Sequence, residues 1–138
     1  MRVIQFDVHG VAQPQGSSRA FVNRKTGRAI VTSSNPQLKD WRGLVAEAAR
    51  EWMAGREPYE GACEVEALFF LPRPKSVKRP YMTVKPDADK LLRGLLDSIT
   101  HVIIRDDAQV TDATARKRYV SDLVPSPVTV ITIKIEEK

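Results

Sequence analysis

The chain has 138 residues, of which 42% are hydrophobic and 28% charged, and this mixture is typical of one globular domain rather than of a disordered chain. The single cysteine, Cys63, excludes an internal disulfide framework, and with only His9 and His101 beside it the chain lacks the ligands of a structural zinc site. The net charge of +5 favours a polyanionic partner, whereas the lack of a leader pattern and of any apolar run near about 20 residues predicts a cytoplasmic protein with no membrane contact.

The first third of the chain predicts a strand, a loop and a hairpin. Met1–His9 alternates apolar and polar residues, which is typical of a strand. Gly10–Ser18 is rich in Gly, Pro, Gln and Ser without periodicity, and this indicates a loop. Two short apolar runs within Ala20–Thr32 flank Asn23–Gly27, which predicts a hairpin that turns through these residues.

A helix and a second strand follow. Asn35 is a good N-cap residue and Pro36 suits the first turn of a helix, so the helix is expected to begin there. Apolar residues recur at helical spacing as far as Trp52, and Gly55 ends the element. Ala62–Leu71 alternates apolar and polar residues and predicts a strand that stops before Pro72.

The second half predicts a basic loop, a helix and two closing strands. Lys75–Lys85 is basic and is followed by a leucine-rich helical pattern over Asp89–Thr100. An irregular connection leads to strands over Ala113–Val120 and Val128–Ile135. The order strand, hairpin, helix, strand, helix, strand, strand predicts a single α+β domain over residues 1–138, with a mixed sheet and helices packed on it.

Charge is distributed unevenly along the sequence. Seven basic residues and only two acids lie between Leu71 and Arg93, and the balance reverses from Asp97 to Asp112, where four aspartates face one basic residue, Arg105. Such a positive segment running into a carboxylate-rich one is unusual. It directs attention to the acids at the boundary.

Asp87 and Asp89 stand two residues apart before the leucine-rich helix, where an extended backbone directs both side chains to one face. Arg93 and Asp97 follow at steps of four and share the face opposite the leucines. One interpretation is a capped surface helix with an ion pair between Arg93 and Asp89 or Asp97. The other is a functional cluster in which Arg93 contacts a phosphate.

The second acidic cluster favours the functional interpretation. Asp106 and Asp107 stand among apolar residues, and burying such a pair even partly is costly unless a cation or donors compensate. Mg²⁺ takes one or two carboxylates and keeps waters, so Asp87, Asp89 and one acid of this turn could form a half-open site. An aspartate-rich turn without a metal is the alternative, and the spacing alone leaves both open.

The chemistry implied by these residues is phosphodiester hydrolysis. A bound Mg²⁺ lowers the pKa of a water ligand and neutralises charge on the phosphoryl oxygens. The basic residues before the acids reverse the repulsion that carboxylates exert on a nucleic-acid backbone.

The segment Pro86–Asp97 with Asp106–Val110, reading PDADKLLRGLLD and DDAQV, resembles the RusA family of Holliday junction resolvases. The resemblance implies a Mg²⁺-dependent, prophage-associated endodeoxyribonuclease of RusA-like α+β fold that acts as a homodimer in a bacterial or phage-infected cell, with Mn²⁺ as a possible substitute. Carried over by position, the metal-binding acids are Asp87, Asp89 and Asp107. The family's functional basic residue falls on Arg93; where that residue is lysine, this chain differs, and arginine keeps the charge but is poorly suited to proton transfer.

The resulting hypothesis is resolution of four-way DNA junctions by paired symmetric nicks, with Asp87, Asp89, Asp107 and Arg93 as catalytic residues and no cofactor beyond the metal. The alternatives are a non-catalytic basic DNA-binding dimer and a metal-dependent nuclease for another nucleic-acid structure. Asp106, Gln109 and Lys117 match common family residues as supporting groups. The predicted DNA-binding residues are Lys75, Lys78, Arg79, Lys85, Lys90, Arg93 and Lys117.

Overall fold

The computed structural model describes residues 1–16, 19–22, 26–27, 29–32 and 37–137. A four-stranded sheet with strand order β1-β6-β4-β5 forms the body; β4 and β5 run parallel, and the other neighbours are antiparallel. This confirms the predicted α+β domain with a mixed sheet. The elements are β1 (Arg2–His9), β2 (Arg19–Val22), β3 (Ala29–Thr32), α1 (Leu38–Met53), β4 (Cys63–Leu71), α2 (Ala88–Ile99), the short 3-10 helix η1 (Asp107–Gln109), β5 (Val110–Tyr119) and β6 (Val128–Ile135).

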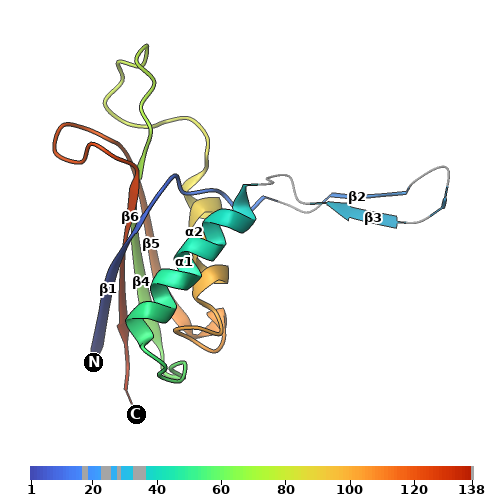
Figure 1. Ribbon diagram of the computed structural model, residues 1–138, viewed down its shortest axis with the longest axis vertical. Coiled ribbons are helices and arrows are strands. Elements are labelled where there is room, and N and C mark those ends of the chain that lie inside the picture. Colours follow the sequence, from blue (N-terminus) through green and yellow to red (C-terminus); the bar gives the residue numbers. More distant parts are fainter. Residues whose placement is uncertain (17–18, 23–25, 28, 33–36, 138) are drawn as a thin grey trace.

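The two long helices pack on one face of the sheet, where Figure 1 shows α1 in front of the strands with α2 beside it. β4 alternates buried and less buried residues along its whole length, because every second side chain points to the helices. Trp41 and Val45 of α1 and Leu91 and Leu95 of α2 are buried in this core. Each such side chain contributes about 1.5–3 kcal/mol through burial. The helices are therefore held rigidly against the sheet.

The predicted hairpin is present as β2 and β3, which pair antiparallel from Arg19–Thr32 to Val22–Ala29. Figure 1 shows this hairpin reaching away from the sheet and the helices. The turn expected over Asn23–Gly27 lies partly outside the described residues.

α1 begins at Leu38, with Gln37 in the N-cap position. The expected N-cap Asn35 and first-turn residue Pro36 lie outside the described residues. The helix ends at Met53, and Ala54 and Gly55 follow with left-handed φ angles of 50° and 83°. The predicted end at Gly55 is confirmed, because glycine adopts this conformation without steric cost.

Several boundaries differ from the sequence-based expectation by one residue, and the start of β5 differs by three. β4 begins at Cys63 rather than Ala62, α2 ends at Ile99 rather than Thr100, and β5 ends at Tyr119 rather than Val120. α2 begins at Ala88, one residue earlier than the predicted Asp89. β5 begins at Val110 rather than Ala113, because Thr111 and Asp112 are exposed on an edge strand and their polar sequence is typical of a loop. In the ranges that the structure describes, neither long helix has the length and apolar character needed to cross a bilayer.

Candidate active site and nucleic-acid interface

An open cleft of about 730 Å³ lies along the exposed side of α2. Asp89, Arg93 and Asp97 follow one another at steps of four on this helix, so they share a face opposite the buried leucines. The η1 turn brings Asp107 to the same cleft. Two of the three predicted metal-binding acids and Arg93 therefore meet. The lining residues are Gln15, Gly16, Asp89, Leu92, Arg93, Leu96, Asp97 and Asp107.

The loop after β1 forms the rim of the cleft. The backbone N–H of Gln15 donates a hydrogen bond to the carbonyl of Lys90 at 2.9 Å, which ties this loop to α2. A Cβ atom on Gly94 would lie 3.2 Å from the carbonyl oxygen of Gln13 and 3.6 Å from the backbone nitrogen of Gln15. The glycine therefore permits the loop to cross the helix closely and to place Gln15 and Gly16 beside the aspartates.

The η1 turn is stabilised by a capping box. The Asp106 carboxylate accepts a hydrogen bond from the Ala108 N–H at 2.9 Å, and the side-chain oxygen of Gln109 accepts one from the Asp106 N–H at 2.9 Å. The Ala108 N–H is the main cause that lowers the pKa of the Asp106 carboxyl below its usual value. Asp106 thus holds the turn, while the neighbouring Asp107 faces the cleft.

Gln109 also anchors this turn to the rest of the fold. Its side-chain N–H groups donate to the carbonyl oxygens of Tyr59 and Gly61, both at 2.9 Å. Arg105, at the start of the turn, forms an ion pair with Glu60 at 2.7 Å. The position of Asp107 is therefore fixed by contacts that join it to the segment before β4.

Asp87 occupies a different position from Asp89. It is the N-cap residue of α2, in an extended conformation, and its carboxylate oxygen lies 3.6 Å from the Lys90 ammonium nitrogen. It lines an adjacent pocket of about 480 Å³ together with Lys85, and the two pockets share Gly16. The expectation that Asp87 and Asp89 share one face of an extended backbone is wrong, because the helix begins between them and turns the chain by about 100° per residue.

The chemistry of the cleft fits a hard divalent cation. Asp89 and Asp107 are exposed carboxylates on one cleft, and Mg²⁺ is typically held by one or two carboxylates while it keeps several waters. Across the described ranges, no three His, Cys, Asp or Glu side chains gather closely enough to enclose a metal by themselves. The residues thus suit an open site rather than a closed one.

Arg93 is exposed on the cleft. The ion pair with Asp89 or Asp97 that one interpretation of the sequence favours is absent from the part of the chain that the structure describes. Its guanidinium group is therefore available to bind an anion beside the two carboxylates.

Lys117 holds the segment that leads into α2. Its ammonium group donates hydrogen bonds to the carbonyl oxygens of Val84 at 2.8 Å and Pro86 at 2.9 Å. This lysine lies in β5 opposite Phe69 of β4, on the side of the sheet that carries the helices. Two of its three N–H bonds are thus engaged in positioning the backbone directly before Asp87.

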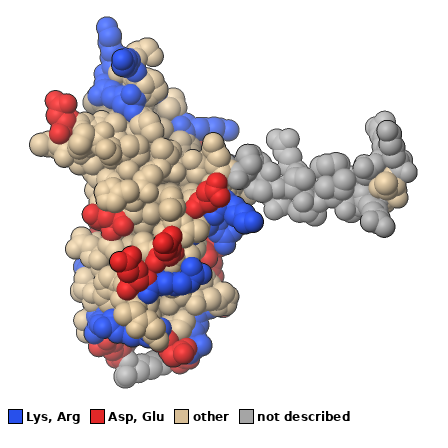
Figure 2. All heavy atoms as spheres, viewed as in Figure 1, with Lys and Arg blue, Asp and Glu red and all other residues tan. Residues whose placement is uncertain are grey.

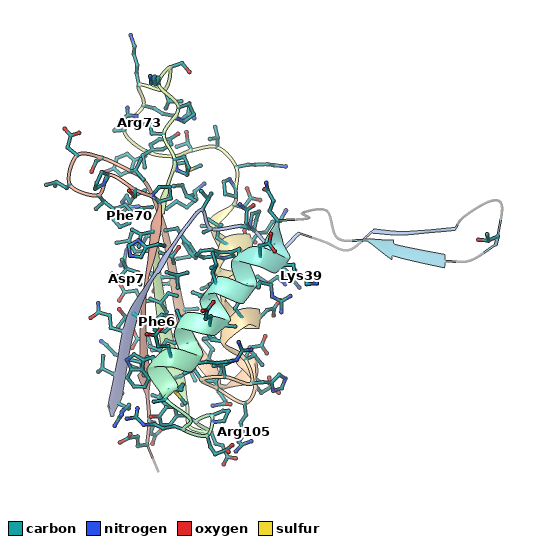
Figure 3. All side chains as sticks on the ribbon, in the orientation of Figure 1. Phe6, Asp7, Lys39, Phe70, Arg73 and Arg105 are labelled. Carbon is teal, nitrogen blue, oxygen red and sulfur yellow. The ribbon has the colours of Figure 1, made fainter. Side chains whose placement is uncertain are left out.

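The basic loop between β4 and α2 has internal structure. Arg73 donates to the carbonyl oxygens of Val77 at 3.1 Å and Arg79 at 3.2 Å, and both arginines lie over the ring of Tyr119. Figure 2 shows Lys and Arg gathered at this end of the molecule, and Figure 3 places Arg73 there. The predicted DNA-binding residues Lys75 and Lys78 are exposed on the same loop.

Two cleft residues with polar side chains, Gln15 and Asp97, were not among the predicted site residues. Asp97 continues the spacing of four from Asp89 and Arg93, so the helical period was a sufficient signal for it. Gln15 reaches the cleft through a backbone contact between distant segments, and no pattern in the sequence indicates that contact.

A family model described as "Endodeoxyribonuclease RusA" matches residues 12–134 of this chain. The match includes the rim loop, α2 and the η1 turn, which together form the cleft. The protein named "Uncharacterized protein YqaN" from Bacillus subtilis (strain 168) is 28% identical to this chain, and the similarity covers 86% of this chain and 89% of that relative.

Proposed function

Because the chain belongs to the RusA endodeoxyribonuclease family, whose members are hydrolases that act on DNA junctions, we propose that it resolves four-way junctions by Mg²⁺-dependent, paired symmetric nicks. The observation that best supports this proposal is the common cleft of Asp89, Arg93 and Asp107. We place the reaction in the cytoplasm of a bacterial or phage-infected cell, where its DNA substrate is found.

Asp89 and Asp107 are the first two proposed metal ligands, and Asp87, at the wall of the adjacent pocket, is the third. When bound there, Mg²⁺, or Mn²⁺ in its place, supplies an activated water and neutralises charge on the phosphate. The ion pair between Asp87 and Lys90 is exposed, so it contributes little stability and leaves the carboxylate available for a stronger partner.

Arg93 is the residue that orients the scissile phosphate. Its guanidinium group can donate two parallel hydrogen bonds to phosphate oxygens from the wall of the cleft that Asp89 and Asp107 also line. Because it is always protonated, it binds and stabilises the anion but transfers no proton. Its removal therefore weakens the reaction at any pH at which the fold persists.

The basic loop and the start of α2 bind the phosphodiester backbone in this proposal. Lys75, Lys78 and Arg79 lie on the loop, and Lys85 and Lys90 line the pocket beside Asp87. Such contacts supply affinity without reading the sequence, as a junction-selective enzyme requires. Lys117, which holds the loop with two of its N–H bonds, retains a third for a phosphate.

We propose a homodimer as the active form. Paired symmetric nicks require two equivalent cleavage sites, and a two-fold dimer with one cleft per subunit provides them. Sedimentation equilibrium of the purified protein tests this point: a monomer at all concentrations that support cleavage contradicts it.

Cleavage of a labelled synthetic four-way junction tests the function. We expect nicks with Mg²⁺ and none with EDTA, and we expect at least about a 100-fold lower rate for Asp89→Asn at unchanged junction affinity. Asp7→Asn is the matched control, because Asp7 is an exposed acid on β1 (Figure 3) and is not among the residues that line the cleft. Cleavage of duplex, flap or RNA substrates in preference to the junction, or a wild-type rate for Asp89→Asn, contradicts the proposal.

A further inference from the structure

A third hollow, of about 780 Å³, lies between α1 and the end of α2. Gln15 and Asp97 line both this hollow and the cleft that holds Asp89 and Asp107, so the two adjoin. We call this third hollow the α1 groove. Its lining residues are Gln15, Leu38, Lys39, Arg42, Gly43, Ala46, Arg50, Asp97, Ser98, Thr100, His101 and Val102.

The basic and the acidic side chains of α1 lie on different faces of the helix. The helix carries three basic and three acidic side chains, and all three basic side chains line the α1 groove, while none of the acidic ones does. With about 100° per residue, positions 39, 42 and 50 fall on one stripe of the helix and positions 40, 47 and 51 on the next. The basic residues are Lys39, Arg42 and Arg50, and the acidic ones are Asp40, Glu47 and Glu51.

These three cations lack acidic partners in the part of the chain that the structure covers. None of the ion pairs found there involves Lys39, Arg42 or Arg50, although Glu47 stands only three residues before Arg50. Asp97 is the one carboxylate among the groove's lining residues, at the side where the groove meets the cleft. The α1 groove is therefore a positively charged channel that opens into an acidic cleft.

The spacing of the cations suits a phosphodiester strand. Eleven residues separate Lys39 from Arg50, which corresponds to about 16 Å along the helix axis. A DNA strand carries one phosphate per about 3.4 Å of duplex axis, so the groove is as long as the rise of about five base pairs. Figure 3 shows Lys39 at the start of α1, on the end of the helix nearer to the basic loop with Arg73.

We propose that the α1 groove binds the phosphate backbone of the DNA strand as it leaves the cleft, through Lys39, Arg42 and Arg50. This site is separate from the basic loop between β4 and α2 and gives the enzyme a second phosphate track on the other side of the scissile bond. The inference rests on the proposed function in taking DNA as the ligand and the α2 cleft as the place of the cut.

The test compares two double variants that remove equal charge. Arg42→Gln/Arg50→Gln alters the groove, and Arg116→Gln/Lys134→Gln alters exposed residues that face away from the helices on β5 and β6. Junction affinity is measured by fluorescence anisotropy in EDTA over a salt series. At about 0.1 M salt the groove variant should bind about tenfold more weakly than the control variant, and its salt slope should fall by about two units.

Two further readouts separate this inference from the proposed function. In a series of junctions, each phosphate near the cut is replaced in turn by a neutral methylphosphonate. Replacement within about five nucleotides of the cut should weaken binding by the wild type, and it should not weaken binding by the groove variant. The inference is overturned if the groove variant and the control variant have equal junction affinity and equal salt slope while both keep the thermal melting of the wild type. This holds even if the wild type cleaves junctions. Absence of cleavage by the wild type overturns the proposed function and leaves this binding test readable.

Discussion

In each of the two acidic segments of the chain, one aspartate faces the cleft and the other stands at the start of a helix. In the first, Asp87 pairs with Lys90 at the start of α2 and lines the adjacent pocket, while Asp89 faces the cleft. In the second, Asp106 caps the η1 turn and Asp107 faces the cleft. Neighbouring acids of identical chemistry thus differ in role because of where each helix begins: the N-cap residue stands two positions before Asp89 and one position before Asp107.

The two acidic segments are also held in place by different kinds of interaction. The η1 turn is fixed by several uncharged hydrogen bonds through Gln109, and these persist at high salt. Asp87 is held by one exposed ion pair, which salt weakens. We therefore expect the position of Asp107 to be the less adjustable of the two, and Asp87 to be the acid that responds to a bound cation.

The same substitution at adjacent acids gives the largest expected difference. Asp107→Asn should lower the single-turnover cleavage rate at least about 100-fold, because it removes a proposed metal ligand. Asp106→Asn should stay within about threefold of the wild type, because the asparagine oxygen still accepts the Ala108 hydrogen bond. Equal losses in the two variants would show that the acids share one role.

Asp87→Asn tests whether the first segment is as asymmetric as the second. We expect a loss of about 10- to 100-fold, smaller than that of Asp89→Asn, because Asp87 lies on the neighbouring pocket and reaches the metal less directly. The measurement is the cleavage rate over a Mg²⁺ titration, with the loss partly recovered at high Mg²⁺. A wild-type rate at all Mg²⁺ concentrations reduces the proposed ligand set to Asp89 and Asp107.

The reactivity of the Cys63 thiol measures how strongly the Asp106 cap stabilises the neighbouring end of the sheet, and the expected effect is smaller. It is buried at the start of β4, paired with Val110, and burial raises the pKa of its thiol, so little thiolate forms at pH 8. Asp106→Ala, which removes the cap, should expose the thiol more often, bring its pKa down towards the usual value and speed iodoacetamide alkylation by about threefold or more. Asp107→Asn should alkylate like the wild type. Equal rates in all three proteins would mean that the Asp106 cap does not stabilise this end of the sheet.

Periodicity was enough to predict most of the fold. β4 and β6 bury one face and α2 has an apolar stripe, so their patterns of two and of about 3.6 residues indicate the elements directly. The start of β5 was missed because Thr111 and Asp112 are exposed at the sheet edge and carry no apolar signal.

The site was only partly predictable. The spacing of four along α2 and the Asp-x-x-Gln pattern of the η1 turn are local, so the shared face of Asp89 and Arg93 and the cap at Asp106 follow from the sequence. The separation of Asp87 from Asp89 depends on a helix boundary, which patterns locate only within one or two residues. The hydrogen bond from the Lys117 ammonium group to the Pro86 carbonyl oxygen joins positions 31 residues apart, and no local sequence pattern indicates it.

Divalent-ion binding tests the central claim most directly, namely that Asp89 and Asp107 together hold a metal ion on the α2 cleft. Mn²⁺ binding to the DNA-free protein can be measured by electron paramagnetic resonance for the wild type, Asp89→Asn, Asp107→Asn and the control Asp7→Asn. We expect saturable Mn²⁺ binding to the wild type and the control and at least about tenfold weaker binding to each cleft variant. Equal Mn²⁺ affinity in all four proteins would contradict it.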